Sequence, residues 1–158
     1  MSVSVQIIER GLDQAMKATE RLAGWDHFEL MDTVGRTIQL QTRRRLSSEK
    51  TSPEGVPWKE TQRDNPTLYN TGALHDSIDY RADLNSITVG SPLIYAAIHQ
   101  FGGIIKPKNG KALAFSVGGD SVFAKQVTIP ARPYMGVSPS NAQEIEMVIF
   151  DFMEAVLQ

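Results

Sequence analysis

The spacing of hydrophobic residues changes twice near the start of the chain. Apolar and polar side chains alternate over residues 3–7, and a period of two predicts a short strand. Over residues 9–22 apolar side chains recur every three or four positions, which predicts a helix that ends at Gly24. A second helix is predicted from Asp26, which can cap it, to about residue 45. The chain is therefore expected to open with a strand and two helices.

Prolines and glycines interrupt this pattern from residue 47 to residue 66. Their density predicts a loop, and a loop of about twenty residues is long for a connection inside one domain. We expect it to be poorly ordered in the isolated protein, at least over residues 51–55. Trp58 lies within the loop and is expected to pin part of it to the core.

Short elements follow the loop. A turn and a short helix are expected around Thr71 and Gly72. Residues 77–81 and 86–90 are alternating and rich in β-branched side chains, so they predict a hairpin that turns at residues 83–85.

A short central helix is expected after Pro92, and the pair of glycines at residues 102–103 would end it. Four residues at helical spacing form its predicted apolar side: Ile94, Tyr95, Ile98 and Phe101. Between residues 104 and 130 strands are expected again.

The chain closes on an amphipathic helix, predicted over residues 141–157 with Ser138 and Pro139 at its start. Residues 112–117 and 122–129 are the best strand candidates before it. The order of elements predicts an α+β fold in a single domain over residues 1–158, with N-terminal helices, a short central helix and a C-terminal helix. Its antiparallel sheet is expected to include residues 77–81, 86–90 and 122–129.

Composition narrows the class of protein. A chain of 158 residues, 41% hydrophobic and 22% charged, suits one globular domain. The net charge of −2 argues against a strongly basic nucleic-acid binder. The absence of cysteine excludes disulfides, thiolate metal sites and cysteine nucleophiles. Neither a signal peptide nor a spanning segment is recognised, so we expect a protein made in the cytoplasm with no membrane partner.

Residue types suited to catalysis are scattered. The histidines His27, His75 and His99 lie far apart, without the close spacing of metal ligands. Neither a nucleophile elbow nor a phosphate-binding loop is present. A metal site of His75, Asp76 and His99 can be drawn, so a metal-dependent hydrolase stays as an alternative. We expect a protein that is not an enzyme, with no catalytic residues, metal or cofactor.

Three consecutive arginines, Arg43, Arg44 and Arg45, end the second predicted helix. Such a cluster could contact phosphates, but successive helical residues point in different directions and cannot share one face. A solvated helix end, or a contact with an acidic patch on a partner, is the favoured interpretation. Nucleic acid is not expected as a partner.

Four motifs occur in a fixed order from residue 53 onward. They are PEGVPW at residues 53–58, LYNTGALHDSI at 68–78, VGS with YAAIHQFGG within 89–103, and IPARPYMG at 129–136. Together they resemble the phage virion morphogenesis, or tail-completion, family of contractile-tailed phages, over about residue 43 to the C-terminus. The last two also resemble neck and tail-completion proteins of long-tailed phages.

This resemblance implies a structural role late in tail assembly. Such proteins cap the head-proximal end of the finished tail or prepare it for joining to the head, commonly as rings that are often hexameric. The implied partners are further copies of the chain, the tail tube or tail terminator, and head-neck proteins. The implied location is the tail or neck of the virion, after assembly in the cytoplasm of the bacterial host. A head-closure or neck connector protein is the alternative within the same class.

Some motif residues have a physical interpretation of their own. Gly72 and Gly102 are expected to supply positive φ angles at turns. Pro130 and Pro133 bracket Arg132 and hold it extended, so its guanidinium could pair with a carboxylate within the fold or across a subunit interface. The alternative is that this segment is only a rigid lead into the last helix. The candidate interface residues are Arg132, Tyr134, Arg43, Arg44, Arg45 and Trp58, and the structural motif residues are Gly72, Tyr95, Phe101, Gly102, Pro130 and Pro133.

Overall fold

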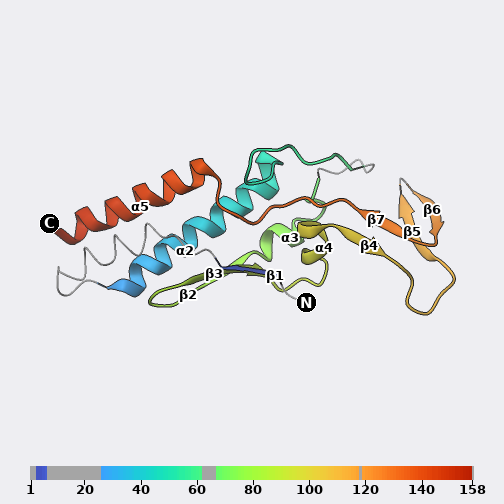
Figure 1. The fold of residues 1–158 in the computed structure, drawn as a ribbon, viewed down its shortest axis with the longest axis horizontal. Helices are drawn as coiled ribbons and strands as arrows, with labels where there is room; N and C mark the ends of the chain where they lie inside the picture. The colour runs from blue at the N-terminus through green and yellow to red at the C-terminus, as the bar shows by residue number, and fades with distance from the viewer. Residues whose placement is uncertain (1–2, 7–25, 62–66, 118, 158) are drawn as a thin grey trace.

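Two long helices, α2 (His27–Arg44) and α5 (Pro139–Leu157), pack against each other in one half of the molecule (Figure 1). The computed structural model describes residues 3–6, 26–61, 67–117 and 119–157, and the helix predicted at residues 9–22 lies outside them. Helix α2 is the central layer, because it contacts α5 on one side and a small sheet on the other. None of the helices in the described ranges is long and apolar enough to cross a membrane.

Helix α2 begins where the sequence predicts. The Asp26 carboxylate accepts hydrogen bonds from the backbone N–H groups of Phe28 at 2.9 Å and Glu29 at 3.2 Å, which caps the helix. At its other end the helix continues into a π-helical turn, η1 (Arg45–Glu49), which ends at Lys50 with a φ of 56°. The predicted loop therefore starts later than residue 47, because the chain keeps its helical hydrogen bonding for a further turn.

The first sheet is antiparallel, with β3 (Ile87–Ser91) between β1 (Val3–Gln6) and β2 (Asp79–Ala82). Strands β2 and β3 form the predicted hairpin, and its turn is closed by a 2.8 Å bond from the Asp83 N–H to the Ser86 carbonyl. The N-terminal strand is confirmed over the described residues and pairs with β3.

The prediction that residues 122–129 join this sheet is wrong. That segment is split between β6 (Asp120–Ala124) and β7 (Val127–Ile129), since the chain bends at the exposed Lys125. Strand β6 pairs with β5 (Leu113–Val117), and β7 pairs with β4 (Gly103–Ile105), so two separate two-stranded ribbons form. A period-two pattern predicts strands but does not say which strands pair.

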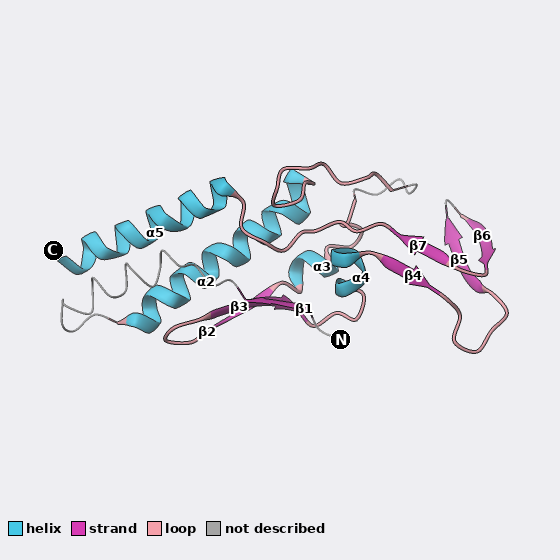
Figure 2. Cartoon of the chain, in the orientation of Figure 1, coloured by secondary structure: helices cyan, strands magenta, loops and turns pink. Residues whose placement is uncertain are grey.

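These two ribbons form an arm that extends away from the long helices (Figure 2). The chain leaves the body through α4 (Ala96–Phe101), runs out along β4, turns back through β5 and β6, and returns along β7. The β5–β6 hairpin and the C-terminal end of α5 thus lie at opposite ends of the molecule's longest axis (Figure 1).

The core lies between α2, the first sheet, the short helix α3 (Ala73–Asp76) and the start of α5. Its buried members include Leu30, Met31, Val34, Ile38, Leu74, Ile78, Ile87, Val89 and Ile145. Gly35 lets the sheet approach α2 closely, because a Cβ there would lie 2.4 Å from Cδ2 of the Tyr80 ring. The Tyr80 hydroxyl completes this contact with a 2.9 Å bond to the Asp32 carboxylate.

The C-terminal helix is confirmed. The Ser138 hydroxyl accepts a 3.1 Å bond from the Asn141 N–H, and Pro139 occupies the first helical position. Ile145 is buried, and Ile149 and Phe152 pack partly buried against the core.

The predicted apolar side of the central helix is wrong. Helix α4 buries Ala96 and Gln100, while Ile94, Tyr95 and Phe101 are exposed, Phe101 at 69%. On its buried side the helix instead presents Gln100, whose side-chain oxygen accepts hydrogen bonds from the backbone N–H groups of Tyr134 and Met135.

Candidate functional site

Three of the four sequence motifs meet at one junction beside α4, and the second lines the cavity next to it. The Gln100 side-chain oxygen accepts hydrogen bonds from the backbone N–H groups of Tyr134 at 2.9 Å and Met135 at 3.0 Å. The Tyr134 hydroxyl donates a 3.1 Å bond to the Ala96 carbonyl. Burial raises the pKa of Tyr134 to about 12, so the hydroxyl keeps its proton and stays a donor. The third and fourth motifs are thereby joined side chain to backbone.

The loop around the first motif is built into the same junction. Trp58 is buried, and its indole N–H donates a 3.0 Å bond to the Pro133 carbonyl. The expectation that Trp58 pins the loop is confirmed.

The expected poor order at residues 51–55 does not match the structure. Thr51 and Pro57 form a β-bridge, and the Ser52 N–H donates to the Val56 carbonyl at 2.8 Å. The ring of Pro53 is buried against Gly136, where a Cβ would lie only 2.7 Å from it. Proline and glycine here shape a closed turn, and composition alone does not distinguish such a turn from a mobile loop.

Arg45 ties the end of α2 to the fourth motif. Its side chain is 1% exposed and donates 2.9 Å bonds to the carbonyls of Tyr134 and Gly136. It also binds the side-chain oxygen of the buried Asn141. Burial lowers the pKa of this guanidinium. The interpretation of the arginines as a solvated helix end is therefore wrong for Arg45, because these three oxygens replace water around it.

The other two arginines are also held within the chain. Arg43 donates to the carbonyls of Asp76 at 3.2 Å and Ile78 at 2.9 Å. Arg44 forms ion pairs with Glu49 at 2.8 Å and Glu144 at 3.0 Å, which raise its pKa. As predicted, the three side chains point in different directions, and each meets a different set of partners.

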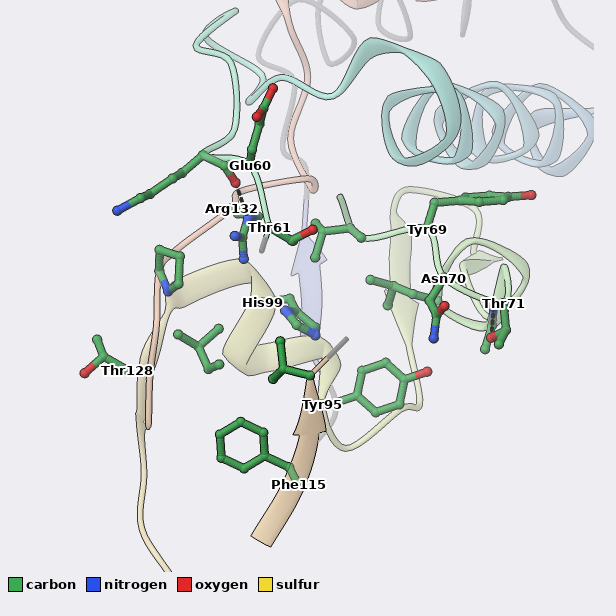
Figure 3. A pocket seen from close by; sticks show the side chains of 17 residues that line it. Glu60, Thr61, Tyr69, Asn70, Thr71, Tyr95, His99, Phe115, Thr128 and Arg132 are labelled. Carbon is green, nitrogen blue, oxygen red and sulfur yellow. Dashed lines mark hydrogen bonds between the residues drawn. The ribbon is translucent and has the colours of Figure 1, made fainter. Parts of the chain in front are cut away.

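A cavity of about 640 Å³ opens beside this junction, between α4, the residues after the Trp58 turn and strand β5 (Figure 3). Its apolar wall includes Tyr95, Phe115 and Val117, and its polar groups include Thr61 and Asn70. Arg132 lines the cavity as well (Figure 3).

Arg132 is 6% exposed. Its Nε donates a 2.9 Å bond to the Lys59 carbonyl, and its backbone N–H donates a 2.8 Å bond to the His99 carbonyl. Burial lowers the pKa of its guanidinium, and among the described residues no carboxylate lies within ion-pair distance of it. A buried cation with no counter-ion in the described chain is suited to receive a carboxylate from outside.

The remaining motif residues have structural positions. Gly72 and Gly102 have φ angles of 81° and 71°, which confirms both expectations. At Gly102 a Cβ would also lie 2.7 Å from the Ala131 nitrogen, so the residues between Pro130 and Pro133 run directly beside it.

The candidate interface residues are thus mostly internal. Tyr134, Arg45 and Trp58 are buried and present no surface to a partner. Tyr95 and Phe101, which were predicted to be structural, are exposed.

The metal site considered from the sequence, His75 with Asp76 and His99, does not form in the structure. His75 binds the neighbouring Asp76 through Nδ1 at 2.7 Å, while His99 packs edge-on against Tyr95 at 5.9 Å between ring centroids. In the part of the chain that the structure describes, no three histidine or carboxylate side chains come together as metal ligands.

Sequence reasoning missed the exposed apolar side chains of α5. Met147 and Phe150 point outward from this helix, on the side away from the buried Ile145. A signal was present, since residues 147–150 are four consecutive apolar residues, and no helix can bury all four against a single neighbour.

Comparison with known proteins identifies the relatives of the chain. A segment is 34% identical over 92 residues to protein G of Escherichia phage Mu, whose name gives capsid assembly as a provisional role, covering 58% of this chain and 48% of that protein. Another is 31% identical over 102 residues to a Mu-like prophage protein of Haemophilus influenzae, FluMu G protein 2, covering 64% of this chain and 62% of that protein. The matched segments thus span about half to three fifths of the length of these relatives.

No solved structure matches the chain. The phage virion morphogenesis family matches residues 3–154, which is nearly the whole sequence. The chain therefore belongs to the phage virion morphogenesis family.

Proposed function

We propose that this protein completes the phage tail at its head-proximal end and makes the tail competent to join the head. The observation that carries the proposal is the family match over residues 3–154. We further propose that it acts as a homo-oligomeric ring in contact with the tail tube or terminator and with neck proteins, and that it is not an enzyme.

The contacts of the motif residues and the exposed apolar side chains support a role in particle assembly. The motif residues form hydrogen bonds that hold elements of the fold together, as between Tyr134 and Gln100 or between Trp58 and Pro133. Large apolar side chains such as Ile94, Phe123 and Phe150 remain exposed, and exposed apolar side chains are typical of proteins that bury them against a partner.

Deletion of the gene from its parent phage or prophage tests this function. We expect heads that form and fill normally, and tails that are of abnormal length or have an unfinished end. In a mixed-extract experiment, tails from the deletion strain should fail to join heads supplied by a strain that lacks tails. Purified protein added to the deletion tails should restore infectious particles.

The same experiment separates the alternatives. A neck connector would leave normal tails and defective heads, so deletion heads would fail to accept tails from a headless strain. A role in capsid assembly, which the name of the phage Mu relative favours, would leave no mature heads. Infectious, head-joined particles of normal tail length from the deletion strain would refute the proposal.

A further inference from the structure

The arm carries a strong excess of positive charge. Residues 103–130 contain four lysines, Lys106, Lys108, Lys111 and Lys125, and a single acidic residue, Asp120. All four lysines are exposed, and none forms an ion pair with another described residue. Exposed apolar side chains accompany them, with Phe123 at 73% and Ile104 at 57%. We call this surface the basic arm.

Helix α5 carries the opposite charge. Residues 139–157 contain four carboxylates and neither lysine nor arginine. Glu144 is occupied by Arg44, whereas Glu146, Asp151 and Glu154 are exposed and make no ion pair with any residue that the structure describes.

These three carboxylates surround an apolar centre. Met147 and Phe150 are 59% and 70% exposed, and residues three or four positions apart share a helix face. The arrangement has the anatomy of a protein interface, with apolar side chains inside a charged rim. We call this surface the acidic helix face.

The basic arm and the acidic helix face of one chain cannot contact each other. The β5–β6 hairpin of the basic arm and the C-terminal end of α5 lie at opposite ends of the long axis (Figure 1). Two copies placed end to end bring them together, and the two surfaces match in sign of charge and in exposed apolar content.

We propose that the acidic helix face of one copy docks on the basic arm of the next, in a head-to-tail interface. Such an interface uses two different patches, so it repeats from copy to copy and forms a ring where the rotation closes. Burial of Met147, Phe150 and Phe123 supplies affinity, while the lysines and carboxylates orient the approach. This inference rests on the proposed ring and names the surfaces that build it.

The occupant of each surface is another copy because the chain itself supplies the complementary charge. The arm also has a physical need for a neighbour. Two-stranded ribbons are marginally stable in water by themselves, and β4–β7 and β5–β6 are both two-stranded. Docking against a helix gives such a ribbon a second layer.

Charge reversal on each surface tests the interface. One variant carries Lys111→Glu and Lys125→Glu, and the other carries Asp151→Lys and Glu154→Lys. The matched control carries Arg36→Glu and Arg81→Glu, two exposed positions away from both surfaces. Circular dichroism would check folding, and light scattering after gel filtration, together with native mass spectrometry, would measure the oligomer.

We expect the unaltered protein and the control to form oligomers larger than dimers. Each reversed variant alone should associate at least about tenfold more weakly, because like charges then face each other. An equimolar mixture of the two variants should regain oligomers in which the two variants alternate, since the acidic helix face of the first meets the basic arm of the second, and the two reversed surfaces again carry opposite charges. A chain with all four substitutions should again form oligomers, because both signs are exchanged.

Oligomers of unchanged size and affinity in both reversed variants would overturn the interface and leave the ring itself standing. An unaltered protein that stays monomeric at every concentration, at low salt as well, would also overturn it. Failure of the tail-completion function is seen separately, as normal tails in the deletion phage. The two proposals can therefore fail independently.

Discussion

Arg45 donates a 2.9 Å hydrogen bond to the carbonyl of Tyr134, which lies 89 residues further along the chain, and both side chains are buried. The bond connects the end of the long helix α2 to the motif that precedes α5. The arginine therefore links helix α2 to the segment that leads into α5.

Replacement of Arg45 by alanine should destabilise the protein strongly. The carbonyls of Tyr134 and Gly136 and the side chain of Asn141 would lose their donor inside the protein, and each buried acceptor left without a partner costs about 1–3 kcal/mol. Urea denaturation of Arg45→Ala would measure the loss. Arg36→Ala is the control, since a change at this exposed position should stay within about 0.5 kcal/mol. Equal denaturation midpoints for the two variants would refute the role of Arg45.

The turn at residues 51–57 should be protected from amide exchange. The N–H groups of Ser52, Gly55 and Trp58 all donate to backbone carbonyls, at 2.8 to 2.9 Å. Trp58→Phe keeps most of the packing and loses the bond to the Pro133 carbonyl, so we expect a loss of about 1 kcal/mol and faster exchange in this turn. Val56→Ala at an exposed position should change neither. Rapid exchange of all three amides in the unaltered protein would show that the turn is open.

Acid should remove the contribution of the Arg44–Glu144 ion pair. Hydrogen bonding from Arg44 is the main cause that lowers the pKa of Glu144 below 4.5 in the folded protein. A carboxyl with a lowered folded pKa stabilises the protein above its unfolded pKa, and this stabilisation is lost as the pH falls through the folded value. The effect is reduced by solvent screening because the Glu144 side chain is 37% exposed.

The measurement compares melting temperatures of the unaltered protein and Glu144→Gln. The unaltered protein should melt higher at pH 7, and the difference should shrink at about pH 3, below the unfolded pKa. Glu60→Gln, at an exposed carboxyl outside both proposed surfaces that forms no ion pair with another described residue, serves as the control and should show no such pH-dependent difference. A difference that is the same at both pH values would rule out the ion pair as its origin.

Arg132 should matter for particle assembly beyond its effect on folding. Its replacement by alanine removes the cation from the cavity and the bond to the Lys59 carbonyl, which as a charged hydrogen bond is worth about 1.5–3 kcal/mol. We expect Arg132→Ala to fold, to melt lower and to fail to complement the deletion phage. Thr128→Ala, at another residue lining the cavity, should complement normally. Normal complementation by Arg132→Ala would leave Arg132 with a structural role only.

Local signals in the sequence predicted the long elements well. The Asp26 cap, the hairpin at β2–β3 and the Ser138–Pro139 start of α5 each depend on residues close together in the chain. Such features can be recognised because cap and turn chemistry acts within a few residues.

Features that depend on distant partners could not be predicted in this way. Nothing near Arg45 in the sequence indicates that Tyr134 and Gly136 will receive its hydrogen bonds, and a run of arginines is usually solvated. The same holds for Gln100, which lies on the buried side of α4 and bonds to residues 34 and 35 positions away. Burial of a polar side chain is decided by its partners, and those are known only from the fold.

The open ribbons of the arm have a consequence for the order of events during assembly. Strands β4 and β7, like β5 and β6, each have one edge that no other described strand pairs with, and lysines beside such edges discourage unintended pairing between chains. If part of the arm becomes rigid only on docking, the first subunit contact loses the conformational entropy of ordering it. Later contacts in the same ring then form between arms that are already ordered. Growth would then be slow to nucleate and quick to close, so free subunits and completed circles would predominate over partial arcs.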